Sequence, residues 1–143
     1  MKYNLRMTKQ FVNYEVVVEL KKLGFDEPCL GRWLVVTKWE KPTGEIILQL
    51  GTRAEDFDKN QFPAPTFSQA FRFFREKYQW QSYIEPTSDQ HSRELGYNYC
   101  LWNYKTGEEY NTMPQNCPSG DWEFEKYEDA ELACLIKLIE INS

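Results

Sequence analysis

Apolar side chains recur at helical spacing in three stretches of the chain, and each stretch predicts a helix. The clearest stretch follows Pro65, where Thr66 and Gln69 form a capping box in which each side chain serves the other's backbone N–H. Beyond it, apolar residues fall on one helical face: Phe67, Ala70, Phe71, Phe74 and Tyr78. This pattern predicts a helix that begins at residue 67.

A second helix is predicted over residues 14–23. Asn13 suits the N-cap position, and Gly24 can end the helix in a left-handed conformation. The run Val16-Val17-Val18 favours a strand instead, because β-branched side chains lose rotamer freedom in a helix. A strand is therefore the alternative for this stretch.

The third predicted helix, over residues 127–141, is apolar on two opposite sides. At about 100° per residue, one side holds Leu132, Leu135, Ile136 and Ile139, and the other holds Ala130, Cys134, Leu138 and Ile141. A helix that is apolar on both sides is normally covered on both. We expect the sheet to cover one side, and another helix or a second copy of the chain to cover the other.

Alternating apolar and polar residues predict the strands, which are 32–39, 46–50, 80–84, 97–104 and a short partner strand ending near 112. Residues 41–45 and 105–108 both contain Thr-Gly-Glu and are predicted to be hairpin turns, whereas residues 51–65 are predicted to be a loop. The sequence thus predicts the α+β class, with an antiparallel sheet of four or five strands flanked by three helices.

The length of 143 residues favours a single globular domain over residues 1–143. Both predicted hairpins carry the pattern W-x-x-x-T-G-E, starting at Trp39 and at Trp102, and two predicted helices open with Tyr-Glu. This faint echo raises an internal duplication of a helix and a hairpin. Thr-Gly-Glu is also favourable turn chemistry in its own right, so the echo has a simpler explanation.

The sequence predicts a cytoplasmic protein without membrane contact. No stretch reaches the ~18 consecutive apolar residues of a membrane-spanning helix, and residues 1–6 lack the apolar core of a secretory signal. The four cysteines are widely spaced and contain no CxxC pair: Cys29, Cys100, Cys117 and Cys134. This usage favours reduced thiols over a disulfide framework.

The net charge of −5 is unevenly distributed along the chain. Residues 1–80 carry 13 basic and 10 acidic side chains, whereas residues 81–143 carry 4 and 12, so the halves are +3 and −8. Such asymmetry is typical of a partner surface or, more simply, of a solvated acidic surface. Direct binding of nucleic acid is not favoured, because neutralising phosphates requires clustered lysine and arginine.

No catalytic, metal-binding or cofactor-binding residues are predicted. The single histidine, His91, lies near no recognisable nucleophile motif, so a Cys–His enzyme is not favoured. The candidate zinc ligands His91, Cys100, Cys117 and Cys134 form no close pair. Asp56, Asp58 and Asn60 imitate only the first half of a calcium loop. Nucleotide-binding and nucleophile-elbow motifs do not occur, although carboxylates could still meet in space.

A candidate partner surface lies on the helix that begins at residue 67. It consists of Arg72, Phe73, Arg75 and Gln79, because an exposed phenylalanine beside basic residues is typical of an interface. The alternative is that Phe73 packs under the loop at residues 51–65.

The five tryptophans raise a second kind of binding surface, a platform that stacks a sugar or a nucleobase. Trp33, Trp39 and Trp102 lie on predicted strands. Half-buried aromatic rings are ordinary core residues of strands, so we expect these three rings to belong to the core.

Three segments of the chain together resemble a known group of proteins. They are residues 20–31 (LKKLGFDEPCLG), 65–78 (PTFSQAFRFFREKY) and 127–141 (YEDAELACLIKLIEI). They resemble an uncharacterised family of small proteins from Bacteroides-type gut bacteria, their phages and mobile elements. The resemblance covers about a third of the chain, and Lys126 stands where the family usually has a small hydroxyl residue as N-cap. It implies a setting but no activity, so no functional residue is carried over.

These observations favour a non-enzymatic accessory protein of a bacterial or phage mobile element that acts by protein–protein interaction. A nucleic-acid-related role, such as an acidic inhibitor of a DNA-binding protein, is the alternative. A Cys–His or carboxylate-based enzyme is the least favoured class. We expect the partner to be a protein, and the chain to be a monomer or a homodimer.

Overall fold

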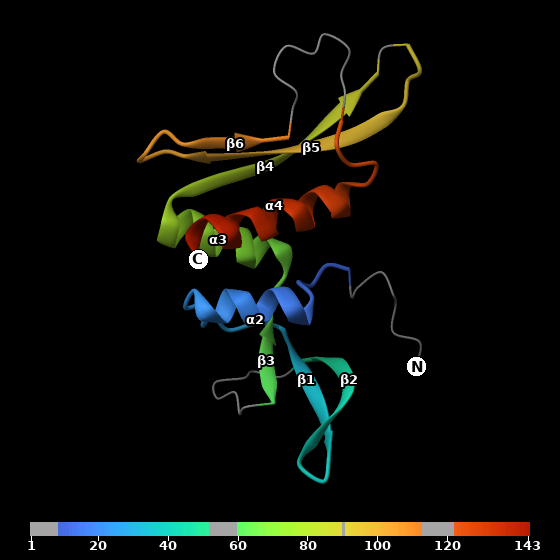
Figure 1. The fold of residues 1–143 in the computed structure, drawn as a ribbon, viewed down its shortest axis with the longest axis vertical. Coiled ribbons are helices and arrows are strands. Elements are labelled where there is room, and N and C mark those ends of the chain that lie inside the picture. Colours follow the sequence, from blue (N-terminus) through green and yellow to red (C-terminus); the bar gives the residue numbers. More distant parts are fainter. Residues whose placement is uncertain (1–8, 52–59, 90, 113–121) are drawn as a thin grey trace. The chain divides into compact units, whose positions relative to one another are not determined.

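The computed structural model describes residues 9–51, 60–89, 91–112 and 122–143, and the chain divides into two compact units (Figure 1). The units are Met1–Ala70 and Phe71–Ser143, and each contains a three-stranded antiparallel sheet. The α+β class is therefore confirmed, whereas the prediction of one sheet with four or five strands is wrong. Within the described ranges, no helix is long and apolar enough to span a membrane.

The first unit contains one helix and a sheet with the strand order β2-β1-β3 (Figure 1). Its elements are α2 (Tyr14–Lys22), β1 (Gly31–Lys38), β2 (Lys41–Leu50) and β3 (Gln61–Ala64). α2 packs against β3, where the rings of Tyr14 and Phe62 meet edge to face with their centroids 5.0 Å apart.

β3 lies within the stretch that was predicted to be a loop. Pro63 and Pro65 favoured the loop, because proline lacks the N–H that a central strand needs. β3 is instead an edge strand, in which Pro63 pairs with Arg32 of β1. An edge strand tolerates proline, so the prolines did not exclude a strand here.

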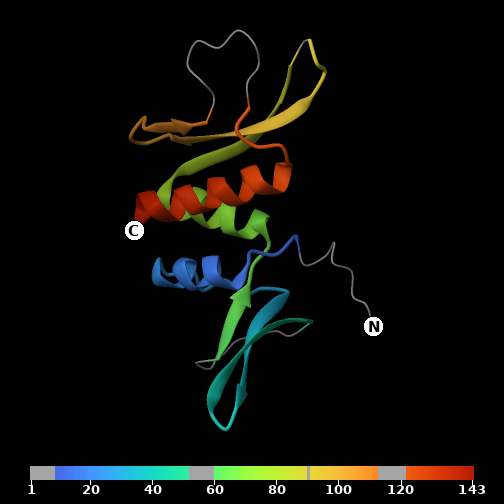
Figure 2. The ribbon, with the colours of Figure 1, turned by 45° about the vertical axis from the view of Figure 1, so that its right-hand side comes forward.

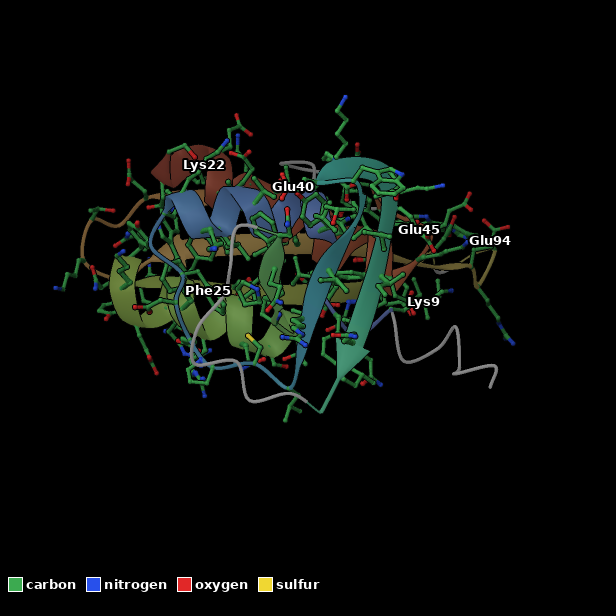
Figure 3. The ribbon with its side chains drawn as sticks, turned by 90° about the horizontal axis from the view of Figure 1, so that it is seen from below. Lys9, Lys22, Phe25, Glu40, Glu45 and Glu94 are labelled. Atoms are coloured by element: carbon green, nitrogen blue, oxygen red, sulfur yellow. The ribbon has the colours of Figure 1, made fainter. Side chains whose placement is uncertain are left out.

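α2 confirms the predicted helix over residues 14–23, and the strand alternative is wrong. Asn13 caps the helix, because its side-chain oxygen accepts a hydrogen bond from the Val16 N–H at 3.0 Å. Val16 and Leu20 are buried, so packing offsets the low helix propensity of valine. Gly24, with φ 90°, follows the helix end, and Phe25 beyond it is buried (Figure 3).

The turn between β1 and β2 lies at Trp39 and Glu40, earlier than predicted (Figure 3). Both residues have positive φ, 55° and 60°, as a two-residue turn of type I′ requires. The Thr-Gly-Glu sequence instead forms a bulge in β2, where Gly44 has φ 84° and the Thr43 hydroxyl donates to the Val36 carbonyl. The bulge therefore uses the left-handed glycine that was expected in the turn.

α3 (Phe67–Tyr78) begins with the predicted capping box. The Thr66 N–H donates to Gln69 Oε1 at 3.1 Å, and the Gln69 N–H donates to Thr66 Oγ1 at 3.3 Å. Gln69 also donates through Nε2 to the Pro28 carbonyl at 3.1 Å. The start of this helix is therefore fixed by local chemistry, as the sequence predicted.

The second unit contains a sheet with the strand order β4-β5-β6. Its further elements are β4 (Trp80–Ser88), β5 (Leu95–Asn103), β6 (Glu109–Asn111) and α4 (Tyr127–Asn142). α4 packs along β4 and β5 (Figures 1 and 2). Phe124 pairs with Tyr97 of β5, so the chain that leads into α4 extends this sheet.

The turn between β5 and β6 agrees with the prediction at residues 105–108. Asn103 Oδ1 accepts hydrogen bonds from the N–H groups of Lys105 and Thr106, and Gly107 has φ 76°. The sequence W-x-x-x-T-G-E thus closes this hairpin but forms a bulge in the other. The shared sequence does not give the two hairpins a common structure.

α4 buries residues from both of its predicted apolar sides. Leu135 and Leu138, one from each side, are fully buried, whereas Ile136 is exposed. The two leucines are three positions apart and therefore lie only about 60° from each other around the helix. The buried residues of α4 thus form one broad side, and cover on two opposite sides stays a prediction. Lys126 at the N-cap makes no side-chain hydrogen bond to the helix.

Candidate functional site

The candidate partner surface on α3 does not expose its phenylalanine. Arg72 and Arg75 are exposed, but Phe73 is only 6% exposed, and its ring meets Tyr78 edge to face with the centroids 5.8 Å apart. The exposed alternative for Phe73 is therefore wrong. Residues 52–59, the centre of the loop expected to cover this ring in the other alternative, lie outside the described part of the chain.

Gln79 has a structural role at the end of α3. It has a positive φ of 62°, and its Nε2 donates to the carbonyls of Glu76 and Lys77 at 3.2 and 3.1 Å. These carbonyls belong to the last turn, which has no partners within the helix. A partner role for Arg72, Arg75 and Gln79 stays a prediction, without the exposed ring that motivated it.

Two of the three tryptophans that were expected in the core are exposed. Trp39 in the first hairpin turn is 86% exposed, and Trp102 in β5 is 49% exposed. Only Trp33 fits the expectation, since it is half-buried and its indole Nε1–H donates to the Val12 carbonyl at 2.8 Å. A strand residue is buried only where another layer covers its side of the sheet, and periodicity alone does not identify that side.

The second sheet has one side that faces α4. Tyr97 and Tyr110 point to this side, because their rings contact α4: Tyr97 meets Tyr127 edge to face at 5.7 Å, and Lys137 Nζ lies 5.4 Å from the Tyr110 ring centroid. Leu101 also lies on this side, opposite Tyr110, and is fully buried. The alternate residues of the three strands therefore point away from the helix.

These alternate residues form an aromatic and acidic surface, which we call the outer face. Residues directly opposite each other in antiparallel strands share a side, and Tyr83 pairs with Cys100 while Trp102 pairs with both Gln81 and Glu109. The outer face comprises Gln81, Tyr83, Glu85, Cys100, Trp102, Glu109 and Asn111. In the described part of the second unit, no helix lies on this face (Figures 1 and 2).

Tyr83 and Trp102 are two exposed aromatic residues on the outer face. Tyr83 is 51% exposed and Trp102 is 49% exposed. Tyr83 stands opposite Cys100, two residues before Trp102 on β5, so the two aromatic residues are diagonal neighbours within reach of each other. Aromatic rings of this kind are enriched at protein interfaces.

Two carboxylates lie beside the rings. Glu109 Oε1 accepts hydrogen bonds from Asn111 Nδ2 at 3.0 Å and from the Cys100 thiol at 3.8 Å. Tyr83 stands directly opposite Cys100 in the neighbouring strand, so the phenol and the thiol lie on the same side. Glu85 follows Tyr83 by two residues on β4, which puts its side chain on the same side.

The Tyr83 phenol and the Cys100 thiol both have raised pKa values. The hydrogen bond with Cys100, followed by burial and the fields of Glu85 and Glu109, raises the pKa of Tyr83 to about 12. Burial raises the pKa of the Cys100 thiol, and the hydrogen bond with Tyr83 offsets this only in part. At neutral pH the phenol and the thiol are therefore both protonated, so neither serves as a base or a nucleophile.

Asn98, a fully buried residue of β5, pairs with Glu85, so its side chain points to the same side of the sheet as the outer face. Its Nδ2 donates to Thr87 Oγ1 at 3.3 Å, and its Oδ1 accepts from Thr112 Oγ1 and from the Glu123 N–H, both at 3.1 Å. One amide thus ties β4, the end of β6 and the approach to α4 to the central strand.

Trp122 lies at the far end of the same side of the sheet. Its ring covers Gly96, where any Cβ would overlap the ring. A shallow depression of about 360 Å³ adjoins it, lined by Glu94, Leu95, Trp122 and Glu125. Its lining residues include two carboxylates, Glu94 and Glu125, but no serine, cysteine, histidine or lysine.

The other candidates from the sequence do not assemble in the described ranges. No group of three or more His, Cys, Asp or Glu residues there could hold a metal ion. His91 is exposed, and its backbone N–H donates to Asp89 Oδ1 at 2.7 Å. The cysteines at 29, 100 and 134 are free thiols, as predicted, whereas Cys117, Asp56 and Asp58 lie outside the described residues.

Comparison with protein-family models, with curated proteins and with solved structures found no match to this chain. The outer face is therefore argued from its own geometry. Sequence reasoning missed Tyr83 and Glu109 and assigned Trp102 to the core. The available signal was the alternation in residues 81–85, which places Gln81, Tyr83 and Glu85 on one side of a strand.

Proposed function

We propose that this chain is a non-enzymatic accessory protein that acts by binding a protein partner on the outer face. The observation that carries the proposal is the pair of half-exposed rings, Tyr83 and Trp102, on the side of the sheet that faces away from α4. Exposed apolar surface of this kind, rimmed by polar groups, is typical of an interaction site.

The chemistry of the face supports binding rather than catalysis. Its thiol and phenol keep their protons at neutral pH, and its remaining groups are amides and carboxylates. Strands hold these groups in fixed positions, so little conformational entropy is lost when a partner docks. The resemblance to small proteins of bacterial and phage mobile elements adds the setting that we propose for this interaction.

A second candidate function is the inhibition of a DNA-binding protein. The acidic charge of the second unit favours it: residues 71–143 carry 7 basic and 13 acidic side chains, a net charge of −6. An acidic surface can occupy the basic surface that a partner uses for nucleic acid. In this role the chain itself does not bind nucleic acid.

Capture of partners from native host lysate tests the proposal. The Tyr83→Ser/Trp102→Ser double variant removes both rings from the outer face. Trp39→Ser/Tyr127→Ser is the matched control, because it removes the same two ring types from exposed positions away from the outer face. We expect the first variant to lose a partner that the wild type and the control both retain. Equal capture by all three folded proteins would refute the proposal.

A further inference from the structure

The two carboxylates of the outer face have no cationic partner among the described residues. Neither Glu85 nor Glu109 takes part in an ion pair there, whereas Lys22 pairs with Glu19 and Lys137 pairs with Glu140 within their helices. Glu109 accepts hydrogen bonds from an amide and a thiol, neither of which carries a positive charge. The face therefore presents two negative charges that are open to an incoming cation.

The neighbouring sequence has few cations to supply. Residues 113–121, which follow β6 and precede Trp122, contain no lysine or arginine. The whole stretch 81–143 has four basic residues against twelve acidic ones, and one of the four, Lys137, lies on α4 over the ring of Tyr110. The charge complement of the outer face is therefore expected from another molecule.

The exposed rings add a second attraction for the same kind of group. A lysine or arginine side chain is stabilised over the face of a tyrosine or tryptophan ring, and nearby carboxylates stabilise its charge further. This sheet already makes such a contact on its other side, where Lys137 Nζ lies 5.4 Å from the Tyr110 ring centroid. Tyr83 and Trp102 offer the same contact on the outer face, without a cation from the described residues.

We infer that the outer face binds an extended basic segment of a protein, with an arginine or lysine side chain seated against the rings of Tyr83 and Trp102 and paired with Glu85 and Glu109. This inference rests on the proposed function and names the chemistry of its partner. Alternate side chains of an extended segment recur at about 6.6 Å, which suits contacts repeated along a strand.

Two other ligand classes fit the face less well. A neutral sugar could stack on the same rings, but it would leave both carboxylates without a charge partner. A nucleic acid would bring phosphates toward Glu85 and Glu109, which repel them. The cationic segment is the class that uses the rings and the carboxylates together.

The test is titration of the full chain with a short peptide of alternating arginine and glycine, followed by the amide signals of β4–β6 in NMR. The Glu85→Gln/Glu109→Gln variant removes two charges and keeps an oxygen at Glu109 that can accept the Asn111 and Cys100 hydrogen bonds. The control, Glu128→Gln/Asp129→Asn, makes the same change in charge at exposed positions in the first turn of α4.

We expect the peptide to shift outer-face signals and the Glu85/Glu109 variant to weaken binding at least about tenfold, against about twofold or less for the control. Raising the salt from about 50 mM to about 500 mM should weaken wild-type binding, because a shorter Debye length screens these charges. Equal loss in both variants, absence of binding, or displacement of the peptide by cellohexaose at the rings would overturn the inference. Ring-dependent partner capture would still support the proposed function in each of these cases.

Discussion

Replacing Asn98 with alanine should destabilise the second unit strongly, because Asn98 is buried and hydrogen-bonded to several parts of the unit. The side chain is fully buried, and its hydrogen bonds include those to Thr87, Thr112 and the Glu123 N–H. Alanine removes these bonds and leaves their partly buried partner groups without them. The change also separates the approach to α4 from the central strand of the sheet.

The magnitude follows from the number of bonds. Each intramolecular hydrogen bond contributes a net ~0.5–1.5 kcal/mol, and a buried group left unsatisfied costs more. Three bonds predict a loss of about 2–4 kcal/mol in the free energy of unfolding for Asn98→Ala. Thr87→Val, which removes only the bond at the amide nitrogen, should cost about 0.5–1.5 kcal/mol and serves as the matched control.

Urea unfolding followed through the amide signals of β5 measures this loss in the second unit itself. The Glu123 amide should also lose hydrogen-exchange protection in Asn98→Ala and keep it in Thr87→Val. The reasoning is refuted if Asn98→Ala costs no more than Thr87→Val, because the three bonds would then not act together.

Three further predictions concern the core and the protons. Leu135→Ala and Leu138→Ala should each cost about 2–5 kcal/mol in urea unfolding, because both side chains are fully buried; a neutral result for either would contradict the burial of this side of α4. Alkylation without reductant should modify all four cysteines in the denatured chain but react slowly at Cys100 in the folded chain, where burial raises the thiol's pKa; a disulfide would contradict this expectation. Absorbance titration should find Tyr83 ionising near pH 12, and Cys100→Ala should lower that pKa toward 10, whereas an unchanged pKa would show that Cys100 does not hold the phenol proton. Because the folded state keeps this proton above the pKa of an unfolded tyrosine, stability should fall as the pH rises from about 10 to about 12.

Local chemistry was predicted well from the sequence. The capping box at Thr66 and Gln69 and the N-cap at Asn13 form as expected, because the groups involved are at most three residues apart. The Gly44 bulge shows the limit of such reasoning. A left-handed glycine was required there, but the pairing of β1 with β2 decided whether it made a turn or a bulge.

Long-range pairing was not accessible in the same way. The strand at residues 61–64 joins the first sheet only through β1, and its prolines suggested a loop. Six strands therefore form two sheets among the described residues rather than one larger sheet. Local alternation contains no term for which strands become neighbours, so it could not separate these arrangements.

The outer face was missed for a related reason. The alternation at residues 81–85 identifies two sides of β4, but it does not say which side α4 covers. Trp102 was assigned to the core because aromatic residues in strands are usually half-buried. Its pairing with Gln81 instead places it on the side of the sheet that faces away from α4. Once the side covered by α4 is known, the strand register alone identifies Tyr83, Glu85, Trp102 and Glu109 as residues of the other side.

Photo-crosslinking in the native host tests the central claim most directly. p-Benzoylphenylalanine placed at Tyr83 should form a covalent adduct with a protein partner, because that ring lies in the proposed interface. The same group at Tyr127, which is also exposed but lies at the start of α4 on the other side of the sheet, should form little or no such adduct. Adducts of equal yield at the two positions, or none at Tyr83, would contradict the assignment of the outer face as the partner-binding surface.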